Sequence, residues 1–160
     1  MRAPDFAEPI NGWRAWRVAE TRHGLRLWSV IYDEPWEPRS PFAATCRDGH
    51  AHAAPAAECE CGVYASRSSL AAARYLLGRN DPAIVHRVVG LVSLWGSVFE
   101  GVGGWRAALG YPRQLWVPAG PGAAEVARRL EAYGVPVVET AVRCPVDVAA
   151  ALDGELRLAS

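Results

Sequence analysis

The stretch Val85-His-Arg-Val-Val-Gly-Leu-Val-Ser-Leu-Trp-Gly-Ser-Val-Phe-Glu100 is the longest run of strand-forming residues in this 160-residue chain. It is followed by Gly101-Val-Gly-Gly104, a turn sequence, and by a second strand-like run from Trp105 to Val117. Two such runs joined by a glycine-rich turn predict a β-hairpin. Gly90 and Gly96 interrupt the first run and indicate a bulge, a sharp bend or the close approach of another backbone.

A second hairpin is predicted nearer the N-terminus. The runs from Gly12 to Val18 and from Leu25 to Tyr32 are rich in aromatic and β-branched residues, and Arg22-His23-Gly24 between them is typical of a turn. In the first run, alternation places Trp13 on one face and Trp16 on the other. We therefore expect both faces of this strand to be partly covered.

Shorter elements are predicted around these hairpins. A short strand is expected from Cys61 to Ala65, and a helix capped by Ser68 or Ser69 is expected to run to about Leu77, with Gly78 and Asn80 at its end. Further elements are expected near the C-terminus: a helix over 123–133 closed by Gly134, a strand over 135–138, a helix over 145–152 and a frayed end.

Residues that commonly bind metal are concentrated between the two hairpins. Cys46, His50, Cys59 and Cys61 follow the pattern C-x3-H-x8-C-x-C, in a proline-rich segment that cannot form long regular elements. Three thiolates and one imidazole are a standard closed, tetrahedral ligand set for structural zinc. Such a long loop is uncommon in a compact domain unless it is functional or held in place. The sequence therefore predicts a structural Zn²⁺ bound by these four side chains.

Two features of this site stay open at the level of sequence. His52 competes with His50 for the fourth ligand position, and Cys144 could replace either. A catalytic zinc keeps three protein ligands and a water, so Glu58 or Glu60 could instead serve as a general base. The deaminase signature, H-x-E followed by P-C-x-x-C, is absent from the sequence. The structural site is preferred over the catalytic one.

Other ionisable residues give weaker signals. A nucleophilic cysteine could pair with His23 or His86, but nothing in the sequence links them, and Glu100 and Asp33 are expected at strand ends in solvent. The glycine-rich turn is not a phosphate-binding loop, because no lysine follows it and the next element is a strand. The prolines and glycines of 118–122 precede a helix, where a plain linker is preferred over an anion site.

The charge balance limits the classes of partner. The 17 basic residues, all arginine, balance the 17 acidic residues, so no overall positive field attracts nucleic acid or an anionic membrane. No apolar run approaches the ~20 residues of a membrane span, and the N-terminus lacks the apolar core of a secretory signal. The sequence predicts a cytoplasmic protein with no membrane partner.

Seven tryptophans are many for a chain of this length. Interleaved arginines give the pattern a superficial likeness to a platform for single-stranded nucleic acid; they are Arg14, Arg17, Arg26 and Arg106. Because the net charge is zero, we prefer to interpret the tryptophans as core or barrel-lining residues with internally bonded indole N–H groups. This prediction applies to Trp13, Trp28, Trp95 and Trp105.

Several linked motifs resemble those of a family of uncharacterised bacterial proteins. They are Cys46, a histidine at 50 or 52, Pro55, Cys59, Cys61-Gly-Val-Tyr-Ala65, Gly90-x-Val-x-Leu-Trp-Gly-x-Val-x-Glu100, Gly104-Trp-Arg-Ala107 and Tyr111-Pro112. The resemblance spans roughly 12–116. It implies a shared fold and a shared cysteine-histidine cluster, and it implies no activity. Gly-Trp-Arg-Ala also occurs at 12–15, but the flanking residues do not match, so we infer no duplication.

Together these observations predict one α+β domain over 1–160. A β-rich, zinc-stapled core over 12–117 is expected to form a bent antiparallel sheet or small barrel, and 118–160 a helix-strand appendage, with two to three helices in all. The predicted function is a non-enzymatic, zinc-stabilised binding or regulatory module for a protein or small ligand. A small metal-dependent hydrolase and a nucleic-acid-binding domain are the alternatives.

Overall fold

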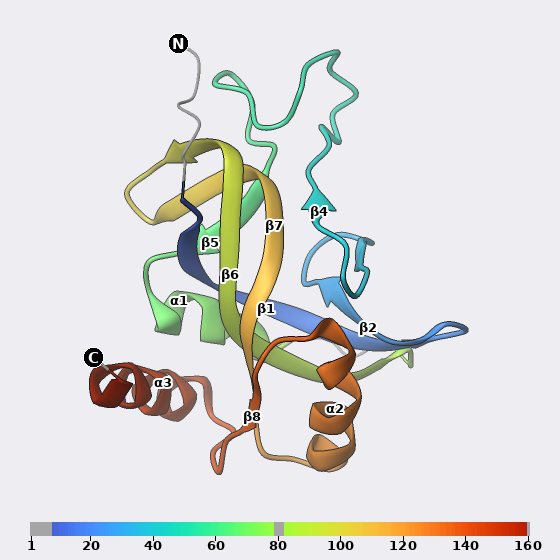
Figure 1. The fold of residues 1–160 in the computed structure, drawn as a ribbon, viewed down its shortest axis with the longest axis vertical. Helices are drawn as coiled ribbons and strands as arrows, with labels where there is room; N and C mark the ends of the chain where they lie inside the picture. Colours follow the sequence, from blue (N-terminus) through green and yellow to red (C-terminus); the bar gives the residue numbers. More distant parts are fainter. Residues whose placement is uncertain (1–7, 79–81, 160) are drawn as a thin grey trace.

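The computed structural model describes residues 8–78 and 82–159 (Figure 1). In this part of the chain a mixed sheet of eight strands is accompanied by three α-helices, which makes the fold α+β. The strands are β1 (Ile10–Thr21), β2 (Gly24–Ser29), β3 (Pro35–Trp36), β4 (Phe42–Ala43), β5 (Val63–Ser66), β6 (Ile84–Glu100), β7 (Gly104–Val117) and β8 (Val137–Glu139). The helices are α1 (Ser69–Ala73), α2 (Ala123–Leu130) and α3 (Pro145–Ala159), with short 3₁₀ turns η1 (Arg74–Leu76) and η2 (Glu131–Tyr133).

Both predicted hairpins are confirmed. β6 and β7 pair antiparallel from Val89↔Trp116 to Glu100↔Trp105, and β1 pairs with β2 from Trp16↔Ser29 to Thr21↔Gly24. The β1–β2 hairpin is joined to the β6–β7 hairpin, because β1 pairs antiparallel with β6 over most of the length of β1.

A partial ring of strands results from these pairings. β5 pairs with β7 along its whole length and meets β1 at a single residue pair, Trp13↔Ser66. The pairings β1–β6, β6–β7, β7–β5 and β5–β1 therefore return to their starting strand. All pairings between strands of the predicted 12–117 core are antiparallel. The sheet as a whole is mixed, because β8, predicted as part of the C-terminal appendage, pairs parallel with β7 at Leu115↔Val137. The chain crosses from the end of β7 back to its side through α2. A crossover connection of this kind places β8 beside β7 in the same direction.

Gly96 lies at a strand irregularity and Gly90 at a close approach of two backbones, as predicted from their place in a long strand. The β6–β7 register shifts between Leu91 and Val92 and again between Trp95 and Val98. Gly96 lies inside the second irregularity at φ 75°, where a glycine avoids steric strain. At Gly90 the backbone of the neighbouring strand comes so close that a Cβ atom would lie 2.1 Å from the carbonyl oxygen of Gln114.

Apolar side chains cover both faces of the sheet. Val88 belongs to the main core with Trp16 and Leu130, whereas its neighbour Val89 points the other way, to a second cluster containing Trp116. This alternation explains why strand β6 is apolar on both faces. Helix α2 covers the main core, and helices α1 and α3 cover the second cluster.

The tryptophan prediction needs correction. Of the four tryptophans predicted as core residues only Trp13 is buried, and the other three are partly exposed. Trp28, for example, lies on the face of β2 opposite the buried Leu27. The most deeply buried tryptophans are Trp16, Trp36 and Trp116. Of the predicted internal indole bonds, that of Trp28 is present, since its N–H donates to Asp33 Oδ1 at 2.9 Å. Trp16 was not part of this prediction, and its buried Nε1 has no partner within the described residues.

The predicted helices are present. The Ser68 hydroxyl accepts a hydrogen bond from the backbone N–H of Ala71 and so caps α1. Asn80, expected near the end of this helix, lies outside the described residues. Gly134 follows η2 in the left-handed conformation. Helix α3 continues well past the predicted end at residue 152.

The residues after Pro118 contribute to both sheet and core. The buried Tyr133 hydroxyl donates to the carbonyl oxygen of Trp36 and accepts the N–H of Leu27 at 2.8 Å, which links η2 to β2 and β3. Burial raises the pKa of Tyr133, so this hydroxyl keeps its proton.

Among the described residues, none of the helices has the length and apolar character needed to cross a membrane.

We predict that Gly90→Ala lowers the free energy of unfolding by about 2 kcal/mol or more, because the new methyl group would collide with the backbone of Gln114. Gly103→Ala is the control, since no atom lies within 4 Å of its added Cβ. Urea unfolding followed by tryptophan fluorescence measures both. Equal stability of the two variants would contradict the close approach of β6 and β7.

Candidate metal site and adjoining pocket

Strands β4 and β5 form one interrupted strand along the edge of β7. Ala43 pairs with Leu109, the N–H of Ala44 donates to the carbonyl oxygen of Ala108 at 2.8 Å, and Val63 pairs with Ala107. The chain therefore leaves β7 after Ala44 and returns to the next position of the same edge. Residues 45–62 form an excursion with adjacent ends, at the opposite end of the molecule from α2 and α3 (Figure 1). We call these residues the metal loop.

The metal loop brings its thiol and imidazole groups together. Cys46 Sγ lies 3.7 Å from Cys59 Sγ and 3.7 Å from His50 Nδ1, and Cys61 Sγ lies 3.4 Å from His52 Nε2. In a tetrahedral zinc site with Zn–S bonds of about 2.3 Å, neighbouring sulfur atoms are about 3.8 Å apart, and sulfur–nitrogen separations are slightly shorter. Each of these three separations is close to one edge of such a tetrahedron.

Two overlapping groups of side chains could hold a metal ion. The first contains Cys46, His52, Cys59 and Cys61, and the second contains Cys46, Asp48, His50 and Cys59; in each group the ligand atoms lie within 4.8 Å of one another. The three predicted cysteines are thus together in the first group with His52. His50, predicted as the fourth ligand, belongs to the second group.

Asp48 was not anticipated from the sequence, because an isolated aspartate in a polar loop carries no distinctive signal. Its carboxylate Oδ2 lies 3.8 Å from Cys59 Sγ. Cys144 is exposed and belongs to neither group among the described residues. It lies beside Pro118 and Gly120 at a different concave surface.

Hydrogen bonding within the metal loop affects the two shared thiols in opposite ways. Burial would raise the pKa of Cys46, but the backbone N–H groups of His50 and Asp48 and the Cys59 thiol lower it below the ordinary value. The backbone N–H of Cys61 favours the Cys59 thiolate, but burial and the neighbouring thiols outweigh it, so the pKa of Cys59 is raised. Cys46 is therefore the more readily ionised of the pair.

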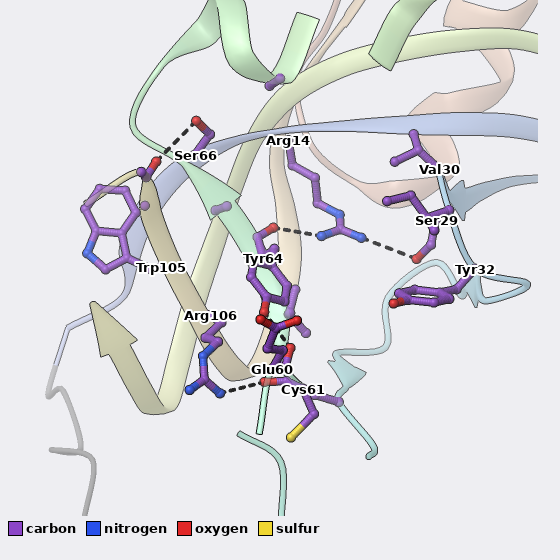
Figure 2. A pocket seen from close by; sticks show the side chains of 18 of the residues that line it. Arg14, Ser29, Val30, Tyr32, Glu60, Cys61, Tyr64, Ser66, Trp105 and Arg106 are labelled. Atoms are coloured by element: carbon purple, nitrogen blue, oxygen red, sulfur yellow. Dashed lines mark hydrogen bonds between the residues drawn. The ribbon is translucent and has the colours of Figure 1, made fainter. Parts of the chain in front are cut away.

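A large pocket adjoins the metal loop. It has a volume of about 1000 Å³ and lies between β1, β5, β7, α1 and the segment after β2. Cys61 and Glu60 form part of its wall, and Arg14 reaches into it between Tyr64 and Ser29 (Figure 2). Cys61 thus belongs both to the pocket wall and to the first metal-ligand group.

Arg106 connects the metal loop to the sheet. Its Nη1 donates to the carbonyl oxygens of Ala56 and Cys61, both at 2.9 Å, and its guanidinium lies 4.6 Å from the ring centroid of Phe99. The β7 residue therefore holds two points of the loop backbone. The next residue after Cys61, Gly62, has φ 134°, and a Cβ atom added to it would lie 3.1 Å from Cβ of Arg106. Glycine therefore suits this turn into β5.

The remaining candidates lie apart from this site. His23 Nε2 is 3.0 Å from Arg22 Nε, and His86 Nε2 is 2.9 Å from the carbonyl oxygen of Pro118. No described contact joins either histidine to a cysteine. Glu100 pairs with Arg67 at the pocket rim, and Asp33 accepts the indole N–H of Trp28 at 2.9 Å. Glu58 is exposed and does not line the pocket.

The arginines considered for nucleic-acid binding are engaged within the protein. Arg17 donates to the carbonyl oxygens of Ser29 and Tyr32, and Arg26 pairs with Glu37 at 2.9 Å. Together with Arg106, these side chains support the fold rather than a free basic surface. In the sequence, Arg14 stands out only as one of the arginines interleaved with tryptophans. Its position in a pocket depends on three-dimensional packing, which strand alternation does not reveal.

Comparison with known protein families, with curated proteins and with solved structures found no match to this chain. The resemblance drawn from the sequence motifs therefore stays a prediction.

We predict that Cys59→Ser removes bound metal, because Cys59 belongs to both groups. Losing a metal present at a thousand times its Kd would lower the free energy of unfolding by about 4 kcal/mol. Elemental analysis of protein purified without added metal, together with thermal unfolding, measures the effect. Cys144→Ser is the matched control and should keep both metal and stability; equal metal content in the two variants would contradict the site.

Proposed function

We propose that this protein is a non-enzymatic binding module stabilised by one structural zinc, with Cys46, His52, Cys59 and Cys61 as ligands. The first group is chosen over the second because zinc prefers thiolate and imidazole, whereas the second group replaces one thiolate with Asp48. Four protein ligands would close the coordination sphere and leave no position for a reactive water.

The observation that carries this proposal is the position of Cys61 in both the first ligand group and the pocket wall. Fixing Cys61 by a metal, with Arg106 bonded to its carbonyl oxygen, would hold one side of the pocket rigid. A preformed pocket loses less entropy on binding than one that must be ordered. The zinc would therefore support binding without touching the ligand, and the pocket would hold a small molecule or a segment of a protein.

The hydrolase alternative rests on Glu60, which lines the pocket beside Cys61. For Glu60 to act as a general base, one of the four ligands would have to be replaced by water. Nucleic acid is not favoured as a partner, because Arg17, Arg26 and Arg106 make the internal contacts described above.

We predict that His52→Ala lowers metal content and reduces the thiolate charge-transfer absorption of the Co²⁺-substituted protein to the same extent, because the three remaining thiolates are an incomplete ligand set. His50→Ala, two residues away in the same loop, is the matched control and should keep both. Elemental analysis and visible absorption spectra provide the two measurements. The reverse result would assign the fourth position to His50, and loss in both variants would show that the two groups cannot be separated.

The binding role is tested with a fragment library screened by ligand-observed NMR on the metal-loaded protein. Ala71 is exposed and lines the pocket, whereas Ala124 is exposed on α2 and does not. We expect Ala71→Trp to abolish binding of the hits, Ala124→Trp to leave it unchanged, and metal removal to weaken it at least tenfold. No hits at the pocket, or metal-dependent turnover of a panel of hydrolase substrates, would overturn the proposal.

A further inference from the structure

Arg14 is a cation placed inside the pocket. It lies on β1, and its Nη1 donates to the carbonyl oxygen of Tyr64 at 2.7 Å while Nη2 donates to Ser29 Oγ at 3.3 Å (Figure 2). Its guanidinium carbon lies 5.0 Å from the ring centroid of Trp36. The Nε atom is buried and has no hydrogen-bond partner among the described residues. A guanidinium has five N–H donors, so this side chain retains unused hydrogen-bonding capacity.

No carboxylate in the described part of the chain forms an ion pair with Arg14. Ser29 connects it to Glu34 only indirectly, since the Ser29 hydroxyl accepts from Arg14 and donates to Glu34. Glu34 itself pairs with Arg47. Burial lowers the pKa of Arg14 to about 10, the direction expected for a cation with little compensation. At neutral pH the group is still charged.

Glu34 offsets part of the cost of burying Arg14 through its charge, but no carboxylate of the pocket wall forms a direct ion pair with Arg14. Arg67 pairs with Glu100 at the rim, and Arg106 is used on backbone carbonyls. Two acidic side chains, Asp48 and Glu60, line the side nearest the metal loop. Arg14 is half-buried and its only hydrogen-bond partners are neutral oxygen atoms, so a ligand anion would provide the direct charge partner that the described residues lack.

Aromatic rings form much of the remaining wall. Trp13, Tyr64, Tyr75 and Trp105 all line the pocket, and Tyr64 and Tyr75 are about half exposed, at 48% and 46%. Of the three arginines in the lining, Arg47 is paired with Glu34 and Arg106 bonds backbone carbonyl oxygens, so exposed rings beside Arg14 suit a ligand with a flat apolar body and one anionic group.

We infer that the pocket binds a small organic carboxylate with an aromatic or flat apolar body, and that Arg14 is the residue that recognises its carboxylate. This inference rests on the proposed binding function and names its ligand class. A carboxylate fits better than a phosphate, because one guanidinium matches one negative charge and the acidic side chains of the wall, which are Glu34, Asp48, Glu60 and Glu100, would repel a dianion more strongly than a monoanion. Because Nε is buried, the remaining N–H groups of Nη1 and Nη2 are those that can donate two parallel hydrogen bonds to the two carboxylate oxygens.

The test compares acids with their neutral amides on the zinc-loaded protein. Benzoate, phenylacetate and naphthalene-1-acetate are each titrated beside the matching amide, and tryptophan fluorescence and ligand-observed NMR follow binding. We expect each acid that binds to do so at least tenfold more tightly than its amide. Arg14→Gln should remove this preference and leave amide binding unchanged.

Arg113→Gln is the matched control, because Arg113 is exposed and lies outside the pocket lining. Arg14→Lys keeps the charge but removes the planar fork, and we expect a smaller, three- to tenfold loss. Metal content and near-ultraviolet circular dichroism confirm that each variant is folded. If Arg14→Gln does not fold, the inference is judged from two other measurements: the ratio of acid affinity to amide affinity in the wild type, and the same ratio in Arg14→Lys.

Equal binding of acid and amide, unchanged acid binding by Arg14→Gln, or the absence of acid binding to the wild type would overturn this inference. Fragment hits that disappear with Ala71→Trp would still support the binding module in those cases, with a neutral or cationic ligand. Failure of both experiments would remove the binding function itself.

Discussion

Backbone pairing along strand β7 fixes where the metal loop begins and ends, and where β5, one wall of the pocket, lies. On one edge β7 pairs with β6, and on the other it pairs in succession with β5, β4 and β8. Because β4 and β5 occupy adjacent positions of that edge, the eighteen residues 45–62 must leave and return at one place. This constraint brings Cys46 close to Cys59 and Cys61, although nothing in their spacing requires it. A metal bound between the two arms of the loop would strengthen an arrangement that the ladder already favours.

The sequence was informative where the signal is local and periodic. The two hairpins, the amphipathic helix α2 and the interruption at Gly90 follow from strand propensity, a 3.6-residue period and the steric freedom of glycine. The pairing of β4 with β7 could not be predicted in the same way, since a two-residue strand has no period. The parallel addition of β8 depends on the route of the chain through α2. His50 and His52 could not be separated either, because both lie in a short run of small residues, and the pocket around Arg14 is a product of three-dimensional packing.

The two copies of Gly-Trp-Arg-Ala lie on either side of β5. Trp13 pairs with Ser66 at one edge, and Trp105 pairs with Ala65 at the other. The arginine that follows each tryptophan donates to a backbone carbonyl oxygen near β5, Arg14 to Tyr64 and Arg106 to Cys61. Similar local surroundings explain why the same four residues suit both positions, without any need for a duplication. The two arginines differ in their surroundings: Arg106 makes both carbonyl contacts through Nη1 and packs against Phe99, whereas Arg14 uses both Nη1 and Nη2 and lies near Trp36, with its buried Nε unpartnered among the described residues.

Metal site and pocket are connected through β5 and the residues just before it. Cys61 is a candidate metal ligand, its carbonyl oxygen is bonded to Arg106, and three residues later the carbonyl oxygen of Tyr64 accepts a hydrogen bond from Arg14. A shift of Cys61 would be passed along this short extended segment, because β5 is held at both edges and cannot deform freely. The position of the Arg14 guanidinium thus depends on the same backbone that carries a metal ligand. The proposed closed metal site and the charged pocket are compatible in one small domain for this reason: a bound metal would fix the segment from which the pocket is built, and recognition of the ligand would be left to the arginine.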